Sequence, residues 1–283
     1  MNMKVDLCGV TLNNPVMTAS GTFGSGAEYA EFVDLNKLGA VVTKGVANVP
    51  WPGNPTPRVA EVYGGMLNAV GLQNPGIDLF VERDIPFLKQ FDTKIMVNVC
   101  GHSTEEYIEV VERLRDQPVD LLEINISCPN VKEGGIAFGQ DPKAVEAITK
   151  EMKKHAAQPV IMKLSPNVTD ITEMARAAEA GGADGLSLIN TITGMKIDIN
   201  RQKFVLANKT GGMSGPAIHP VAVRMVYQTA QAVRLPIVGM GGIMNAEDAI
   251  EMILAGATAV SVGTANFTNP HVTEEIVAGI RDY

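Results

Sequence analysis

The amino-acid sequence predicts an α/β fold, a (β/α)₈ or TIM barrel, and three observations lead to it. Short apolar runs alternate with amphipathic stretches from one end of the chain to the other. The apolar runs are mostly continuous, which is typical of parallel strands buried on both faces. The length of 283 residues suits such a barrel, which typically needs about 250 residues. No linker or charge block divides the chain, so we expect a single domain over residues 1–283.

Eight apolar runs are predicted as the barrel strands. They are Val16–Ser20, Ala40–Lys44, Lys94–Cys100, Leu121–Ser127, Pro159–Ser165, Gly185–Thr191, Pro236–Gly241 and Ala259–Gly263. Ahead of them, Val5–Val10 with Asn13-Asn14 predicts a small N-terminal hairpin. Eight strands that alternate with helices favour a closed parallel barrel.

Amphipathic stretches between the strands predict the outer helices. Apolar residues recur at helical spacing in Glu105–Arg115, Pro142–His155 and Thr172–Ala180. Gly181-Gly182 follows the last of these as a helix stop. The competing architecture, an open doubly wound sheet, usually carries GxGxxG after its first strand. The segment Ser20–Gly26 is rich in glycine but does not match that pattern.

Two connections are unusually long, from Val46 to about Ile77 and from Ile192 to about Ala217. Both follow strands, so in a barrel both lie on the C-terminal face. Long ordered loops inside a compact domain are usually functional. We expect them to form a lid and a partner surface.

Composition and charge exclude several classes of function. The net charge of −8 argues against a nucleic-acid partner, because an acidic surface repels phosphate backbones. The chain has no apolar run of signal-peptide or membrane-helix length, so we expect a cytoplasmic protein without a membrane partner. Its three cysteines, Cys8, Cys100 and Cys128, are scattered and form no CxxC. We therefore expect neither a disulfide framework nor a metal or iron–sulfur site in this chain.

Polar residues recur at the carboxyl ends of the predicted strands, where barrels carry their chemistry. They are Lys44, Asn98, Asn125, Lys163 and Asn190-Thr191. Any one of them alone is better explained as a structural polar group. Their recurrence at one end of successive strands favours an active site.

The last two strand ends predict a phosphate site. Gly241-Gly242 follows the seventh strand and Gly263-Thr264 the eighth. Glycine lets backbone N–H groups approach an anion closely, and loops after these two strands commonly hold phosphate in barrels. A third glycine-rich stretch, Gly211–Gly215, would complete the cradle. Such a site fits flavin mononucleotide (FMN), and it also fits phosphosugars.

The segment Glu123–Val131 narrows the chemistry. Cys128 comes just after a strand end, is followed by Pro129, and lies in a loop with Asn125 and Asn130. A buried cysteine is usually inert, but at this location we interpret it as a reactive thiol. Its unperturbed pKa of about 8.5 allows it to act as a base near neutral pH when its surroundings help.

This cysteine loop resembles the signature of the class 1 dihydroorotate dehydrogenases. Four other segments resemble the same family: Thr43-Lys44-Gly45, Pro52–Arg58, Asn68–Gly76 and Val97-Asn98. The resemblance runs from about Asn13 to the last strand, in matching order. Class 1 enzymes carry cysteine at this position and class 2 enzymes carry serine, so Cys128 resembles class 1. Asn68–Gly76 and Gly45-Val46 resemble the NAD-linked heteromeric (B) subclass.

The resemblance implies a reaction, the oxidation of dihydroorotate to orotate in de novo pyrimidine (UMP) biosynthesis. Cys128 matches the base that removes the C5 proton while hydride leaves C6 for N5 of FMN, and Lys44 matches the lysine that serves both flavin and substrate. The implied substrate-binding residues are Lys44, Asn68, Val70, Gly71, Leu72, Asn125, Asn130, Asn190 and Thr191. The implied flavin contacts are Ser20, Lys44, Gly45, Asn98, Asn125, Lys163, Ile189, Gly215, Gly241, Gly242, Gly263 and Thr264.

The resemblance also implies partners. It implies one FMN in this chain, with FAD and a [2Fe–2S] cluster only in a second, electron-transfer subunit. The expected assembly is a heterotetramer built around a homodimer of barrels. The chain itself has no dinucleotide fingerprint after any strand, which agrees with a separate NAD site.

Three other functions remain open on the sequence. A dihydropyrimidine dehydrogenase has a similar barrel, but its substrate lacks the carboxylate and its loop typically carries His at the position of Asn130. A Schiff-base aldolase or phosphosugar isomerase would use Lys44 or Lys163 and need no flavin. The carboxylate at a strand end that could assist such a lysine is Glu123. A non-catalytic barrel leaves the Cys128 loop unexplained.

Overall fold

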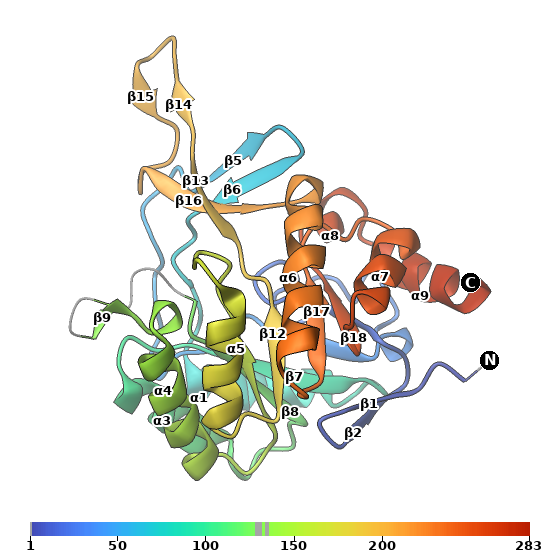
Figure 1. Ribbon diagram of the computed structural model, residues 1–283. Helices are drawn as coiled ribbons and strands as arrows, with labels where there is room; N and C mark the ends of the chain where they lie inside the picture. Colours follow the sequence, from blue (N-terminus) through green and yellow to red (C-terminus); the bar gives the residue numbers. More distant parts are fainter. Residues whose placement is uncertain (1, 128–131, 134–135) are drawn as a thin grey trace.

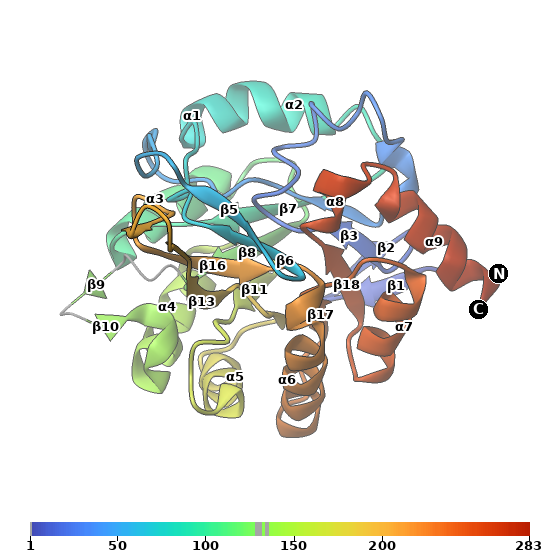
Figure 2. The same ribbon diagram turned by 90° about the horizontal axis from the view of Figure 1, so that it is seen from above.

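A closed barrel of eight parallel strands forms the centre of the molecule (Figures 1 and 2). The computed structural model describes residues 2–127, 132–133 and 136–283. Around the barrel the strand order is β11-β12-β17-β18-β3-β4-β7-β8, and every neighbouring pair is parallel. The strands are β3 (Val16–Thr18), β4 (Ala40–Val42), β7 (Lys94–Val99), β8 (Leu121–Asn125), β11 (Val160–Lys163), β12 (Gly185–Leu188), β17 (Ile237–Met240) and β18 (Ala259–Val262). The predicted TIM barrel is confirmed.

Helices surround the barrel, as the view from above shows (Figure 2). They are α1 (Ile77–Leu79), α2 (Ile85–Leu88), α3 (Thr104–Leu114), α4 (Pro142–His155), α5 (Ile171–Ala180), α6 (His219–Ala232), α7 (Ala246–Leu254), α8 (Ala265–Thr268) and α9 (Val272–Asp282). A π-helical turn, Phe80–Asp84, joins α1 to α2, and short 3₁₀ turns cover Leu35–Lys37, Phe138–Gln140 and Pro216–Ile218. Within the described residues, no helix is long and apolar enough to span a bilayer.

The starts of four helices follow from their capping residues. The side chains of Ser103, Asp141, Asp170 and Asn245 each accept a hydrogen bond from a backbone N–H in the first turn of α3, α4, α5 and α7. Such caps satisfy N–H groups that have no partner inside the helix. The sequence analysis located three of these helices to within a residue or two.

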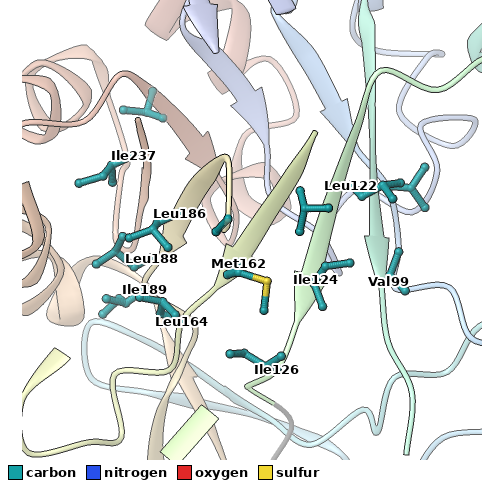
Figure 3. Packing of buried hydrophobic residues seen from close by; sticks show 14 of the residues in the cluster. Val99, Leu122, Ile124, Ile126, Met162, Leu164, Leu186, Leu188, Ile189 and Ile237 are labelled. Atoms are coloured by element: carbon teal, nitrogen blue, oxygen red, sulfur yellow. The ribbon is translucent and has the colours of Figure 1, made fainter. Parts of the chain in front are cut away.

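The apolar core has two layers, separated by the barrel wall. Outward-facing strand residues such as Leu122, Ile124, Met162 and Leu186 pack against the helices (Figure 3). Inward-facing residues such as Leu121, one position away, form a smaller cluster inside the barrel. Strand side chains alternate between the two faces, so both faces of each strand are buried. This explains the continuous apolar runs in the sequence.

The N-terminal hairpin closes the amino-terminal end of the barrel interior. Its strands are β1 (Val5–Leu7) and β2 (Val10–Leu12), and Leu7 and Leu12 are fully buried in the interior cluster with Met17 and Leu121. The turn at Cys8-Gly9 has positive φ at both residues, 56° and 83°. The hairpin therefore makes the amino-terminal end of the barrel interior apolar. The polar inward-facing residues lie at the other end, towards the carboxyl ends of the strands.

A second sheet covers the carboxyl end of the barrel (Figure 1). It is antiparallel, in the order β13-β16-β6-β5, and we call it the lid sheet: β5 (Val59–Val62), β6 (Gly65–Asn68), β13 (Ile192–Met195) and β16 (Thr210–Ser214). The two long connections of the sequence form it together. A ribbon of β14 (Ile197–Asp198) and β15 (Lys203–Phe204) projects beyond it (Figure 1), and β9 (Lys132–Glu133) pairs with β10 (Ile136–Ala137) beside the barrel.

Candidate active site

A cavity of about 480 Å³ lies between the carboxyl ends of the barrel strands and the lid sheet. Every described residue that the sequence analysis placed in the site lines it: Ser20, Lys44, Gly45, Asn68, Val70, Gly71, Leu72, Asn98, Asn125, Lys163, Ile189, Asn190, Thr191, Gly215, Gly241, Gly242, Gly263 and Thr264. Cys128 and Asn130 lie outside the described residues. Ser127, the residue before Cys128, lines the cavity, so the cysteine loop begins at its wall.

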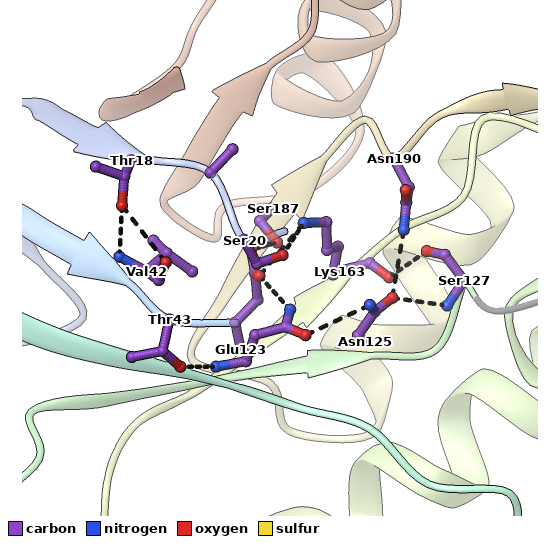
Figure 4. Close-up of polar contacts among 12 residues, drawn as sticks. Thr18, Ser20, Val42, Thr43, Glu123, Asn125, Ser127, Lys163, Ser187 and Asn190 are labelled. Atoms are coloured by element: carbon purple, nitrogen blue, oxygen red, sulfur yellow. Dashed lines mark hydrogen bonds and ion pairs between the residues drawn. The ribbon is translucent and has the colours of Figure 1, made fainter. Parts of the chain in front are cut away.

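A buried ionic cluster lies beneath the cavity (Figure 4). The Nζ atom of Lys163 lies 3.0 Å from Oγ of Ser20 and 3.4 Å from Oε2 of Glu123. Asn98 Nδ2 donates to the same Oε2 at 2.5 Å, and Ser187 Oγ donates to Oε1 at 2.7 Å. Glu123 itself is fully buried and does not line the cavity. The sequence analysis did not place Glu123 in this cluster. Glu123 and Asn125 are two residues apart on the same strand, so both side chains face into the barrel, and this spacing could have revealed it.

A ladder of amides leads from this cluster up to the lid (Figure 4). Asn125 Nδ2 donates to Oδ1 of Asn98 at 3.4 Å, and Asn190 Nδ2 donates to Oδ1 of Asn125 at 3.3 Å. Above them, the side chain of Asn167 donates to the carbonyl oxygen of Thr191 at 3.0 Å. Asn167 lines the cavity and was not predicted. The ladder presents amide donors and acceptors side by side, which suits a ring that carries alternating N–H and C=O groups.

Lys44 and Lys163 supply positive charge at the cavity. Burial lowers the pKa of the Lys44 ammonium below its ordinary value; the neighbouring cations of Lys163 and Arg58 act in the same direction, and Cys100 acts against them. Two lysines beside one cavity in an acidic protein indicate an anionic or electron-rich ligand.

A glycine cradle forms one end of the cavity. Gly215, Gly241 and Gly242 have φ values of 108°, 128° and 68°. A Cβ atom on Gly242 would lie 2.8 Å from the carbonyl oxygen of Gly215, and one on Gly215 would lie 2.5 Å from Cα of Gly65. Thr264 Oγ1, in the neighbouring turn, donates to Ser214 Oγ at 2.7 Å. Gly215 and Gly242 therefore cannot be replaced by a larger residue without displacing the backbone. Because glycine has no side chain, the backbone groups of the cradle stay accessible to an anion. Of the predicted stretch 211–215, Gly215 belongs to the cradle, while Gly211 and Gly212 lie in β16.

The loop after β6 forms a second turn with accessible backbone. Gly71 and Leu72 are successive residues with φ values of 74° and 53°. Asn54 holds this loop: its backbone N–H donates to the carbonyl oxygen of Val70 at 3.0 Å and its Nδ2 to that of Ala69 at 2.9 Å. A left-handed leucine costs about 1–3 kcal/mol and persists where the surroundings enforce it. Successive N–H groups in such a turn form an anion-binding nest.

The fold and the cavity are those of a barrel enzyme: glycine turns after the last two strands and polar residues at the other strand ends line one cavity at the carboxyl face. The chain belongs to the dihydroorotate dehydrogenase family, whose model matches residues 2–283. A protein of Lachnoclostridium phytofermentans described as dihydroorotate dehydrogenase B (NAD(+)), catalytic subunit, is 73% identical over all of this chain and 94% of its own length. Proteins with the same description from Alkaliphilus metalliredigens and Geotalea daltonii are 67% and 56% identical over all of this chain and 94% and 93% of their own lengths.

Proposed function

We propose that this chain is the catalytic subunit of an NAD-linked dihydroorotate dehydrogenase, which oxidises dihydroorotate to orotate in pyrimidine biosynthesis. The observation that carries the proposal is one cavity with three complementary parts: a glycine cradle, an amide ladder and a backbone nest under the lid sheet. A phosphorylated flavin and a carboxylated pyrimidine together need these three parts.

The residues at the cradle and the ionic cluster fit FMN. Gly215, Gly241, Gly242 and Thr264 would hold its phosphate, since all four line the cavity and the three glycines have no Cβ atom to obstruct their backbone groups. Lys163 would place its ammonium beside the ring system. Ser20, Lys44, Gly45, Asn98, Asn125, Ile189 and Gly263 would provide the remaining contacts. When bound, FMN supplies the two-electron acceptor that the reaction needs.

The nest and the ladder fit the substrate. Asn68 and the N–H groups of Val70, Gly71 and Leu72 would bind the carboxylate, because the nest concentrates donors on one point. Lys44, Asn125, Asn130, Asn190 and Thr191 would orient the pyrimidine ring through its amides. The lid sheet would exclude water from the reacting carbons.

Cys128 would remove the proton from C5 of dihydroorotate as the hydride leaves C6. Cys128 follows Ser127, and Ser127 is held at the cavity wall by hydrogen bonds to Asn125 and to the carbonyl oxygen of Lys163. The thiolate of Cys128 would take the proton from a substrate carbon oriented by the amide ladder, and a positioned base of this kind contributes about 10²- to 10⁴-fold to the rate.

The proposal includes a partner, because the electrons must reach NAD. A second subunit with FAD and a [2Fe–2S] cluster would accept them, in a heterotetramer around a homodimer of barrels. The cytoplasmic location expected from the sequence stays a prediction.

The visible spectrum of the purified chain tests the proposal. We expect flavin absorbance that bleaches on anaerobic addition of dihydroorotate and not of dihydrouracil. NADH should form only when the partner subunit is added with NAD. A folded chain that takes up no FMN would exclude the flavoenzyme. Bleaching by dihydrouracil would instead favour a dihydropyrimidine dehydrogenase, and NADH from the isolated chain would exclude the need for a partner.

A further inference from the structure

The carboxylate of Glu123 is held by three donors from three different strands. Ser187 on β12 donates to Oε1, and Asn98 on β7 and Lys163 on β11 donate to Oε2. With Glu123 on β8, the cluster ties together four consecutive strands of the barrel. Both members of the ion pair are almost fully buried: the side chains of Lys163 and Glu123 are 5% and 0% exposed. An ionised carboxylate accepts hydrogen bonds only, so its environment matches the charged form.

Glu123 acts on the cavity through its neighbours. It does not line the cavity, whereas two of its partners, Lys163 and Asn98, do. Any effect of this carboxylate on a bound ligand therefore passes through the position of those two side chains and through its charge. In a buried site both effects are strong, because little water screens them.

We infer that Glu123 is a positioning residue that fixes Lys163 and Asn98 against the flavin ring and sets its reduction potential. The inference rests on the proposed function, since it requires FMN in the cavity. A cation beside the ring favours the reduced, electron-rich flavin. The Glu123 carboxylate, 3.4 Å from the ammonium, offsets part of that charge. Removal of the carboxylate should leave the cation uncompensated and raise the potential of the flavin.

The test is the reduction potential of FMN bound to the purified chain, measured by equilibration with reference dyes. For Glu123→Gln we expect a rise that corresponds to at least a tenfold shift of the equilibrium towards reduced FMN, about 30 mV for a two-electron couple. The matched control is Asp84→Asn, which neutralises another buried carboxylate, one paired with Arg83 outside the cavity. Its potential should equal that of the unaltered chain. A Glu123→Gln chain that binds FMN at an unchanged or lower potential would overturn the inference.

A second pair of variants tests the inference if the Glu123→Gln chain does not fold because Lys163 has lost its carboxylate partner. Lys163→Met alone should lower the potential, and Glu123→Gln combined with Lys163→Met should raise it again, because the double variant leaves no unpaired charge. Equal potentials in the single and double variants would contradict the inference. Failure of the unaltered chain to bind FMN would instead contradict the proposed function, so the two failures are distinguishable.

Discussion

The Nδ1 atom of His219 lies 2.8 Å from the carbonyl oxygen of Gly241. A carbonyl oxygen can only accept a hydrogen bond, so Nδ1 is the donor. His219 is the first residue of α6, and through this bond it holds the glycine turn that follows β17. On its other side, Nε2 of His219 lies 3.1 Å from Oε2 of Glu251 on α7. The buried ring thus connects the Gly241 carbonyl of the cradle to helices α6 and α7 and restrains the backbone at that turn.

His219→Ala should therefore weaken FMN binding without abolishing it. Loss of one hydrogen bond typically costs about 0.5–1.5 kcal/mol, which corresponds to roughly a twofold to tenfold rise in the Kd for FMN. Quenching of FMN fluorescence on titration with apoprotein measures it. His271→Ala, at the exposed start of α9, is the control and should bind normally. Equal affinity of the two variants would mean that His219 does not order the cradle.

Gly242→Ala should lose FMN binding almost completely. The new Cβ atom would lie 2.8 Å from the carbonyl oxygen of Gly215, and φ at this position is 68°. Gly182→Ala is the matched control, because φ there is 88° and the nearest atom to the new Cβ is 3.8 Å away. Both variants carry backbone strain, so both should lose stability to urea. Only the first should lose flavin absorbance; retention of FMN by Gly242→Ala would exclude the cradle as the phosphate site.

Cys128→Ala should keep FMN and orotate but slow the reduction of the flavin by dihydroorotate about 10²-fold or more, since the thiol is proposed to move a proton. Stopped-flow absorbance under anaerobic conditions measures the rate. Cys128→Ser should also be slow, because a hydroxyl is a much weaker acid. Cys8→Ser, which alters a thiol in the N-terminal hairpin, should react at the normal rate. Near-normal reduction in Cys128→Ala would remove that thiol from the mechanism.

Asn68→Ala should weaken the binding of orotate and leave that of uracil, which lacks the carboxylate, nearly unchanged. Asn68 Nδ2 already donates to the carbonyl oxygen of Gly212 at 3.4 Å, a long bond that leaves it available to a ligand. Spectral titration of the bound flavin gives both dissociation constants. The same loss for the two ligands would show that the loop after β6 does not recognise the carboxylate.

Cys8 should make the chain less stable at alkaline pH. Burial, followed by the charges of Asp184 and Asp6, raises the pKa of its thiol from 9.0 to about 12. Between these values the unfolded chain has released a proton that the folded chain keeps, so the free energy of unfolding falls as pH rises. Urea unfolding of the unaltered chain and of Cys8→Ser, from pH 8 to pH 11, measures it. The unaltered chain should lose stability relative to the variant above about pH 9; parallel curves would contradict the shift.

The sequence was sufficient to predict the barrel because burial on both faces leaves a local signal in every strand. The predicted strands that end at Lys44 and Thr191 extend past the observed ends at Val42 and Leu188, because the polar residues that line the cavity follow each strand directly in the chain. The lid sheet was predicted only as two long loops. Its pairing of Asn68 with Gly212 joins segments far apart in the chain, and no local pattern encodes such a register. The sequence analysis considered Glu123 only as the carboxylate partner of a lysine in an aldolase or isomerase. Its position in the ionic cluster was not predicted, because its three hydrogen-bond donors come from three separate strands.

That long-range pairing has a consequence for the order in which the molecule folds. Asn68 and Gly212 are 144 residues apart, and the strands that carry them emerge from opposite parts of the barrel. Closing so long a loop costs entropy that only a formed barrel reduces. The lid sheet should therefore fold last and open first, and its amides should exchange with deuterium before those of β8 and β11. The ligand site would thus be completed only on a chain whose barrel has already closed.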